Sequence, residues 1–178
     1  NKLLDAAGNP LPHLLPVDES LHWAYALHGA RSVNGVDYRQ FSIATDGVPL
    51  VAQVHGGKND SPFDGTPEYF FSPAWGVRGP RWWDKTDYWN DVAGMTWYHD
   101  HALGITRLNV YAGLAGFLPV RDGSDTGKAN NPLGLPADPY ELGFAVQDRM
   151  FWNTGELFYP SIQGDPFWND FILDEEVP

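Results

Sequence analysis

A pair of histidines separated by one residue, His99 and His101, constrains the fold of this chain more than any other feature. Side chains at positions i and i+2 of a β-strand leave the same face, so an extended backbone would point both imidazoles at one site. A third histidine, His55, ends the apolar run 48–55 and is followed by two glycines. Imidazole suits copper, zinc, iron and nickel. The three histidines therefore indicate a metal site on a β-scaffold, and the alternative is that they are structural histidines with ordinary hydrogen-bond partners.

Short strand-like runs separated by turn residues fill the chain. Its 19 glycines and 15 prolines are scattered throughout and favour many short elements. The spacing of apolar and turn residues predicts strands over 48–55, 69–71, 94–99, 115–120 and 142–150, and one short helix over 102–111. The sequence therefore predicts an all-β Greek-key sandwich or barrel with one short helix. No shift in composition marks a second domain within residues 1–178.

Composition limits the classes of partner. The 178 residues are 43% hydrophobic and 19% charged, which is enough for a folded domain with its own core. A net charge of −12 argues against nucleic acid and against a polybasic contact with anionic lipid. The chain has no cysteine, which excludes disulfides, cysteine-containing zinc sites and thiol nucleophiles. With no apolar run long enough to span a bilayer, we expect neither a nucleic-acid nor a membrane partner.

The aromatic residues of the segment 75–98 allow a different function. Three pairs, Trp82–Trp83, Tyr88–Trp89 and Trp97–Tyr98, would form a sugar-stacking platform on a β-sandwich, or else pack under a long loop. The many acidic residues also leave room for a pair of glycosidase-like carboxylates. Neither hypothesis accounts for the spacing of the histidines.

The residues around the histidines resemble a known family. Residues 97–117, WYHDHALGITRLNVYAGLAGF, are similar to the second copper motif of bacterial multicopper oxidases, in the subgroup of spore-coat laccase, bilirubin oxidase and phenoxazinone synthase. Residues 54–57 (VHGG) and 64–68 (DGTPE) resemble the first copper motif and the loop after it. The segments 17–24 and 147–160 also resemble stretches of the family. The resemblance covers most of the chain and implies a cupredoxin-like Greek-key fold.

The resemblance also implies a place in a larger enzyme. Family members are built from three cupredoxin domains, and residues 1–178 look like the N-terminal one alone. The type 1 copper belongs to the last domain, and the trinuclear copper cluster that reduces dioxygen is shared between the first and the last. The implied cofactor is therefore copper. The implied partners are the remaining cupredoxin domains or a second copy of this chain, with dioxygen and a small-molecule reductant as reactants. Such a chain would not turn over alone, and an exported or cell-envelope location fits the family.

Site residues follow position by position from the resemblance. His55, His99 and His101 match type 3 copper ligands, and Asp64 matches an acidic residue that helps to move protons to oxygen at the cluster. Gln53 stands where the family has the histidine that binds the type 2 copper. An amide oxygen is a far poorer copper ligand than imidazole. Two hypotheses result: the first domain of a laccase-like oxidase of phenols, pigments or metal ions, or a non-catalytic cupredoxin module with a decayed copper site.

Residues near the motif are predicted to have structural roles. By strand alternation Asp100 faces away from the histidines on either side of it, as a structural partner and not as a ligand. Two polar residues after the motif are expected to pack and form hydrogen bonds in the barrel: Arg107 and Asn109. Three histidines in irregular segments are expected to face solvent or to pack in loops: His13, His22 and His28.

Overall fold

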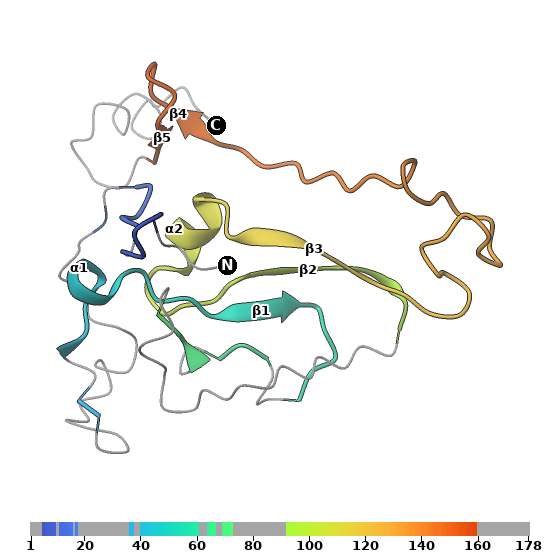
Figure 1. Cartoon of the computed structure of the whole chain (residues 1–178), viewed down its shortest axis with the longest axis horizontal. Coiled ribbons are helices and arrows are strands. Elements are labelled where there is room, and N and C mark those ends of the chain that lie inside the picture. The colour runs from blue at the N-terminus through green and yellow to red at the C-terminus, as the bar shows by residue number, and fades with distance from the viewer. Residues whose placement is uncertain are drawn as a thin grey trace, which may run out of the picture. The chain divides into compact units, whose positions relative to one another are not determined.

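A computed structural model of the chain describes residues 5–9, 11–15, 17, 36–37, 40–60, 64–66, 69–72 and 92–159 (Figure 1). The chain divides into two compact units, residues 1–145 and 146–178.

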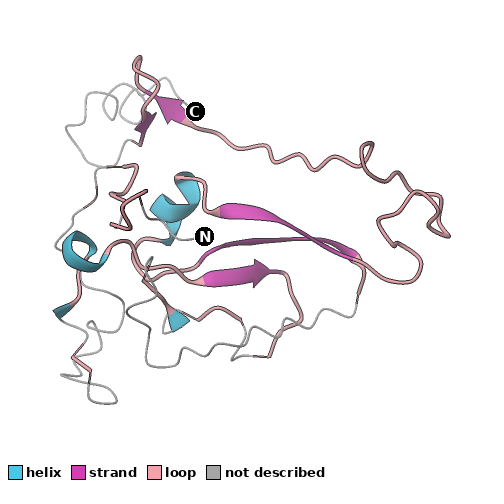
Figure 2. Cartoon of the chain, in the orientation of Figure 1, coloured by secondary structure: helices cyan, strands magenta, loops and turns pink. Residues whose placement is uncertain are grey.

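The first unit contains a three-stranded antiparallel sheet. Its strands are β1 (Ala52–His55), β2 (Gly94–Asp100) and β3 (Ala115–Val120), with β2 in the middle (Figures 1 and 2). All three strands were predicted, but β1 is shorter than the run 48–55. Before β1, Leu50 makes only an isolated bridge. The N–H of Val51 donates to the Asp100 carboxylate at 2.8 Å and not to a neighbouring strand, so the strand begins after this residue.

Two short helices accompany this sheet. The first, α1 (Ile43–Asp46), was not predicted, and the second, α2 (Thr106–Tyr111), begins four residues later than the predicted helix 102–111. Gly104, with φ 77°, lies in the left-handed region and cannot belong to a right-handed helix, so residues 102–105 form a turn instead. No described helix is long and apolar enough to cross a membrane. Strands and loops dominate the described residues, as the predicted all-β class requires.

A small apolar core lies where the histidine-bearing end of β2 meets the segments around it. Its buried members come from α1, from the run before β1, from the bridge region at residue 70 and from the turn before α2: Ile43, Val48, Leu50, Val51, Phe70, Ala102 and Ile105. Removal of these apolar side chains from water stabilises this end of the sheet.

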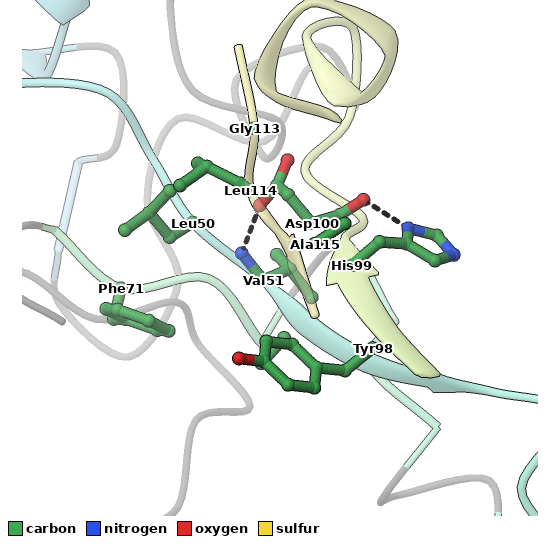
Figure 3. A pocket seen from close by; sticks show the side chains of 10 residues that line it. Leu50, Val51, Phe71, Tyr98, His99, Asp100, Gly113, Leu114 and Ala115 are labelled. Atoms are coloured by element: carbon green, nitrogen blue, oxygen red, sulfur yellow. Dashed lines mark hydrogen bonds between the residues drawn. The ribbon is translucent and has the colours of Figure 1, made fainter. Parts of the chain in front are cut away.

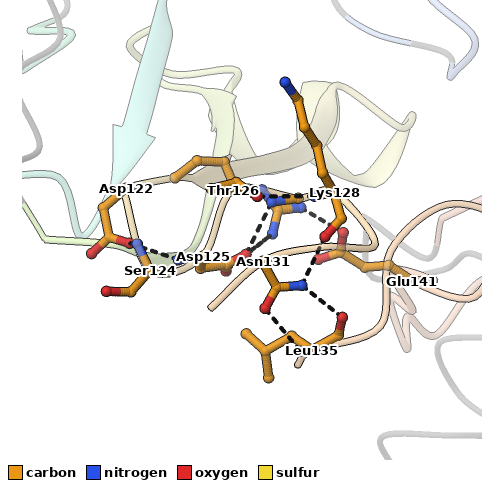
Figure 4. A network of polar contacts seen from close by, with 10 residues as sticks. Asp122, Ser124, Asp125, Thr126, Lys128, Asn131, Leu135 and Glu141 are labelled. Carbon is orange, nitrogen blue, oxygen red and sulfur yellow. Dashed lines mark hydrogen bonds and ion pairs between the residues drawn. The ribbon is translucent and has the colours of Figure 1, made fainter. Parts of the chain in front are cut away.

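Polar contacts organise the loop that follows β3 (Figure 4). The Arg121 guanidinium donates to both carboxylate oxygens of Asp125, at 2.9 and 3.0 Å, and to Glu141 at 2.7 Å. Asn131, only 6% exposed, donates to the carbonyls of Lys128 and Leu135 at 2.8 Å each and accepts from the Leu135 N–H at 2.9 Å. The loop therefore has its own hydrogen-bonded framework.

The second unit contributes a two-stranded hairpin, β4 (Met150–Phe151) and β5 (Leu157–Phe158). The predicted strand 142–150 is wrong except at its last residue. Its alternating apolar side chains are exposed, with Leu142 at 67% and Phe144 at 80%. A strand needs a neighbour to complete its hydrogen-bond ladder, and the described part of the chain provides none for residues 142–149.

Candidate metal centre

The sheet brings the predicted copper ligands to one face. In the antiparallel register of β1 and β2, Gln53 lies opposite His99, and His55 lies opposite Trp97. Because alternate residues share a face, these four side chains leave the sheet on the same side. The His101 ring follows with its centroid 5.9 Å from that of His99. Residues from two strands, far apart in the sequence, therefore meet at one end of the sheet.

Two imidazole nitrogens converge on this face. His55 Nδ1 lies 3.2 Å from His99 Nε2. His99 Nδ1 lies 2.7 Å from the carbonyl oxygen of Asp100, which can only accept, so Nδ1 carries the proton (Figure 3). In the neutral ring, the lone pair of His99 Nε2 then points at His55. Two nitrogens that each lie about 2.0–2.1 Å from one tetrahedral ion would be about 3.3 Å apart, so the observed spacing fits two ligands of a single ion.

An aromatic side chain restrains both rings. Trp97 stacks on His55 with centroids 4.7 Å apart and planes 24° apart, and its centroid is also 4.7 Å from that of His99. His99 is only 9% exposed, whereas His55 is exposed. The packing therefore limits rotation of the pair while it leaves one of the two rings open to a ligand or a partner.

His101 has an unpartnered polar atom. Its Nδ1 is buried and has no hydrogen-bond partner. Buried polar atoms in native proteins nearly always have a partner, so this nitrogen fits a ligand position that an ion would complete. However, no three histidine or acidic side chains of the described residues are grouped so that they could hold an ion by themselves. The histidines fit part of a coordination sphere, and further ligands would have to complete it.

The segment that carries Asp64 runs against β1. Gly65 has φ 63°, and a Cβ there would lie 2.7 Å from the carbonyl oxygen of Ala52 and 2.8 Å from the Cβ of Gln53. Only glycine allows both this backbone conformation and this approach. The exposed Asp64 therefore lies one residue from a backbone contact with the strand position of Gln53.

The side of the sheet that carries His55, His99 and His101 is called the histidine face. Asp100 faces away from it, as predicted. Its carboxylate accepts the N–H of Val51 at 2.8 Å (Figure 3). It also accepts the N–H of Ala102 at 3.1 Å and the amide of Asn109 at 2.8 Å. Burial raises the pKa of Asp100, and these three hydrogen bonds oppose that rise. The side chain ties the start of β1 to the residues after β2.

Asn109 and His13 form a contact that sequence reasoning missed. His13, expected to face solvent or to pack in a loop, is half-buried. Its Nδ1 accepts the Leu15 N–H at 3.0 Å, so its Nε2 carries the proton in the neutral ring and donates to Asn109 Oδ1 at 3.1 Å. The two residues are 96 positions apart, so no local pattern could have revealed the pair.

Because His13 is half-buried, we expect the protein to lose stability in mildly acidic solution. Burial lowers the pKa of His13, although hydrogen bonds with Asn109 and Leu15 and the charge of Asp100 act in the opposite direction. The unfolded chain therefore takes up this proton at a higher pH than the folded chain. The free energy of unfolding should fall as the pH drops through about 6.5 and should level off below the folded pKa. Urea unfolding should show a smaller fall for His13→Gln, and an equal fall in both proteins would contradict this prediction.

The proposed sugar platform receives little support from the described residues. Trp97 and Tyr98 are neighbours on β2 and leave opposite faces of the sheet, so they do not form one stacking surface. The remaining aromatic residues of that hypothesis, and two of the histidines, lie outside the described residues: Trp82, Trp83, Tyr88, Trp89, His22 and His28.

The chain is similar to curated laccases and multicopper oxidases. The chain is 38% identical over 154 residues to a laccase of Bacillus stratosphericus, a match that covers 85% of this chain and 26% of that protein. It is 37% identical over 180 residues to a laccase of Haloferax volcanii, covering 97% of this chain and 27% of the relative. A multicopper oxidase of Arabidopsis thaliana, LPR2, is 30% identical over 160 residues and matches over 88% of this chain. No protein-family model matches the chain.

A solved structure supports the fold. The chain is similar to a variant of the McoA multicopper oxidase from Aquifex aeolicus, with a TM-score of 0.50 and 24% identity over 65% of this chain and 24% of that one. This likeness confirms the predicted cupredoxin fold class. The chain spans about a quarter of the length of the relatives that it matches.

Proposed function

Because this chain is a relative of the multicopper oxidases over about a quarter of their length, we propose that residues 1–178 form the N-terminal cupredoxin domain of a laccase-like enzyme. In this proposal the chain supplies half of a type 2/type 3 copper cluster through His55, His99 and His101. Further cupredoxin domains supply the other half. The whole enzyme oxidises a phenolic, pigment or metal-ion substrate and reduces dioxygen to water.

The convergence of His55 Nδ1 and His99 Nε2, 3.2 Å apart, carries this proposal. Copper bound there would exchange electrons with dioxygen. The residues of this chain orient and support the site: the carbonyl of Asp100 holds the tautomer of His99, and Trp97 limits the rotation of both rings. His101 adds a third imidazole, whose buried Nδ1 is without a partner.

Asp64 is assigned a role in proton transfer. It is exposed, and its neighbour Gly65 packs against the backbone at Gln53. A carboxylate beside the site can take a proton from solvent and pass it to a reacting oxygen. In this proposal Asp64 holds the proton, and the glycine contact sets its distance from β1.

Copper and oxygen measurements test this function. The 178-residue chain should bind copper weakly and show no oxidase activity alone, because it provides only part of the coordination sphere. A longer polypeptide that contains it should bind copper stoichiometrically, as measured by elemental analysis, and should consume oxygen with a phenolic substrate. A longer protein that contains no copper and is inactive would rule out the enzymatic proposal.

A second candidate is a non-catalytic cupredoxin module whose copper site has decayed. Gln53 is the observation that favours it, because this side chain lies opposite His99, at a position well placed for a ligand but with an amide in place of an imidazole. A natural protein that is fully loaded with copper and active would exclude this candidate.

Replacement of Gln53 by histidine discriminates between the two candidates. If the natural site is impaired, Gln53→His should raise copper affinity at least about tenfold, because even a neighbour of a direct ligand typically contributes 10–100-fold. Competition with a Cu(I) chelator measures the affinity, and Gln53→Ala controls for the loss of the amide. A gain in activity of the longer protein with Gln53→His would support decay of the natural site, and an unchanged affinity would contradict it.

A further inference from the structure

Asn109 forms hydrogen bonds with two residues far away in the sequence, His13 and Pro49, and with two nearer ones, Asp100 and Leu114. Its Nδ2 donates to the Asp100 carboxylate at 2.8 Å and to the Pro49 carbonyl at 3.3 Å, and its Oδ1 accepts from His13 at 3.1 Å. Its backbone carbonyl accepts the Leu114 N–H at 3.0 Å. The side chain is only 1% exposed. Such a residue has every hydrogen-bonding group engaged and little freedom to move.

Asp100 connects Asn109 to the histidine face, because it forms hydrogen bonds with both Asn109 and His99. Asn109 donates to the Asp100 carboxylate. The carbonyl oxygen of the same Asp100 accepts the Nδ1–H of His99 (Figure 3). The backbone on either side is also fixed, since the Asp100 N–H donates to Leu114 at 3.1 Å and the His101 N–H donates to Val51 at 2.8 Å. The anchored carboxylate adds to these two bonds in holding the peptide whose carbonyl orients His99.

We propose that Asn109 is a positioning residue for the histidine face, which acts through Asp100 to set the tautomer and the orientation of the His99 ring. The hydrogen bonds of its side chain in the described structure go to His13, Pro49 and Asp100, and not to these three histidines. Its role in copper binding rests on the function proposed above, whereas its effect on the ring of His99 does not require metal.

The metal-free chain tests the first half of this inference. In ¹⁵N NMR spectra of the histidine rings, His99 should carry its proton on Nδ1. Asn109→Ala should move His99 toward a mixture of tautomers, because the Asp100 carboxylate loses one of its three hydrogen bonds and the peptide that it anchors becomes less restrained. A wild-type His99 with its proton on Nε2 would overturn the inference, and this observation requires no variant to fold.

A matched asparagine provides the control. Asn131 is also buried, at 6% exposure, and makes three hydrogen bonds, but it belongs to the loop after β3 (Figure 4). Asn131→Ala should lower stability as Asn109→Ala does, without any change in the His99 tautomer. If the His99 tautomer changed equally in both variants, Asn109 would act only through general stability and the inference would fail.

Copper affinity tests the second half. Asn109→Ala should weaken Cu(I) binding about tenfold, the lower end of what residues behind metal ligands contribute, and Asn131→Ala should leave it unchanged. If His99→Ala abolishes copper binding and a folded Asn109→Ala does not weaken it, the inference fails and the proposed function stands. If the natural chain and its longer protein bind no copper, the proposed function fails, and the tautomer of His99 still decides the inference.

Discussion

Replacement of His99 by alanine should weaken the copper affinity of this chain by at least about 100-fold, because loss of a direct ligand should exceed the 10–100-fold effect typical of residues behind the ligands. His99 lies at the centre of the histidine face. Its Nε2 faces His55 Nδ1 at 3.2 Å, and its ring packs between those of Trp97 and His101. Removal of the imidazole takes away one of the two nitrogens that converge at 3.2 Å, and His55 loses the neighbour with which it would bind an ion.

Competitive titration with a Cu(I) chelator measures this effect, and circular dichroism verifies that the variant is folded. Thr96→Ala is the matched control, because Thr96 lies on the same strand, faces the other side of the sheet and donates a hydrogen bond to the Leu118 carbonyl at 2.6 Å. The control should keep the natural affinity. A folded His99→Ala that binds copper as tightly as the natural chain would remove this histidine from the site.

Replacement of Asp100 by alanine should lower the free energy of unfolding by about 3–5 kcal/mol, because three donors lose this acceptor and each buried unsatisfied donor typically costs about 1–3 kcal/mol. Asp100 is 4% exposed and accepts hydrogen bonds from Val51, Ala102 and Asn109. Alanine leaves all three donors without this acceptor at a largely buried position. Each such buried donor is destabilising by itself.

The amide variant separates the charge from the hydrogen bonds. In Asp100→Asn, one oxygen becomes an NH₂ group that faces a donor, either the Val51 N–H or the pair from Ala102 and Asn109. A smaller loss, about 1–3 kcal/mol, is expected in urea unfolding. The exposed Asp60→Ala should change stability by no more than about 0.5 kcal/mol. A value for Asp100→Ala as small as that of Asp60→Ala would show that the carboxylate does not hold this end of the sheet.

Strand periodicity predicted the essential geometry of the candidate site. The strands at 94–99 and 115–120 were expected almost as observed, and His99 was expected to face the opposite side from Asp100. These predictions succeed because the alternation of side chains follows from the covalent geometry of an extended backbone. They hold wherever a neighbouring strand is present to complete the ladder.

The same reasoning failed where the partner was absent or distant. Residues 142–149 alternate as a strand would, but no partner strand pairs with them in the described structure, and residues 142–148 are exposed. The helix expected from residue 102 begins only at Thr106, because Gly104 adopts a left-handed conformation. Periodicity shows which side chains share a face of an element. It does not show whether a partner strand lies alongside or which backbone conformation a glycine adopts.

By itself the sequence determined that His55, His99 and His101 could serve one site, that Gln53 stands in place of a histidine, and that the chain resembles multicopper oxidases. Only the tertiary structure decided that Gln53 lies opposite His99, that two imidazole nitrogens converge at 3.2 Å, and that Asn109 links His13 to Asp100 behind them. The physical reason is the range of the interactions. Side-chain direction along a strand is a local property of a few residues, whereas strand register and buried hydrogen bonds depend on groups that folding brings together from distant parts of the chain.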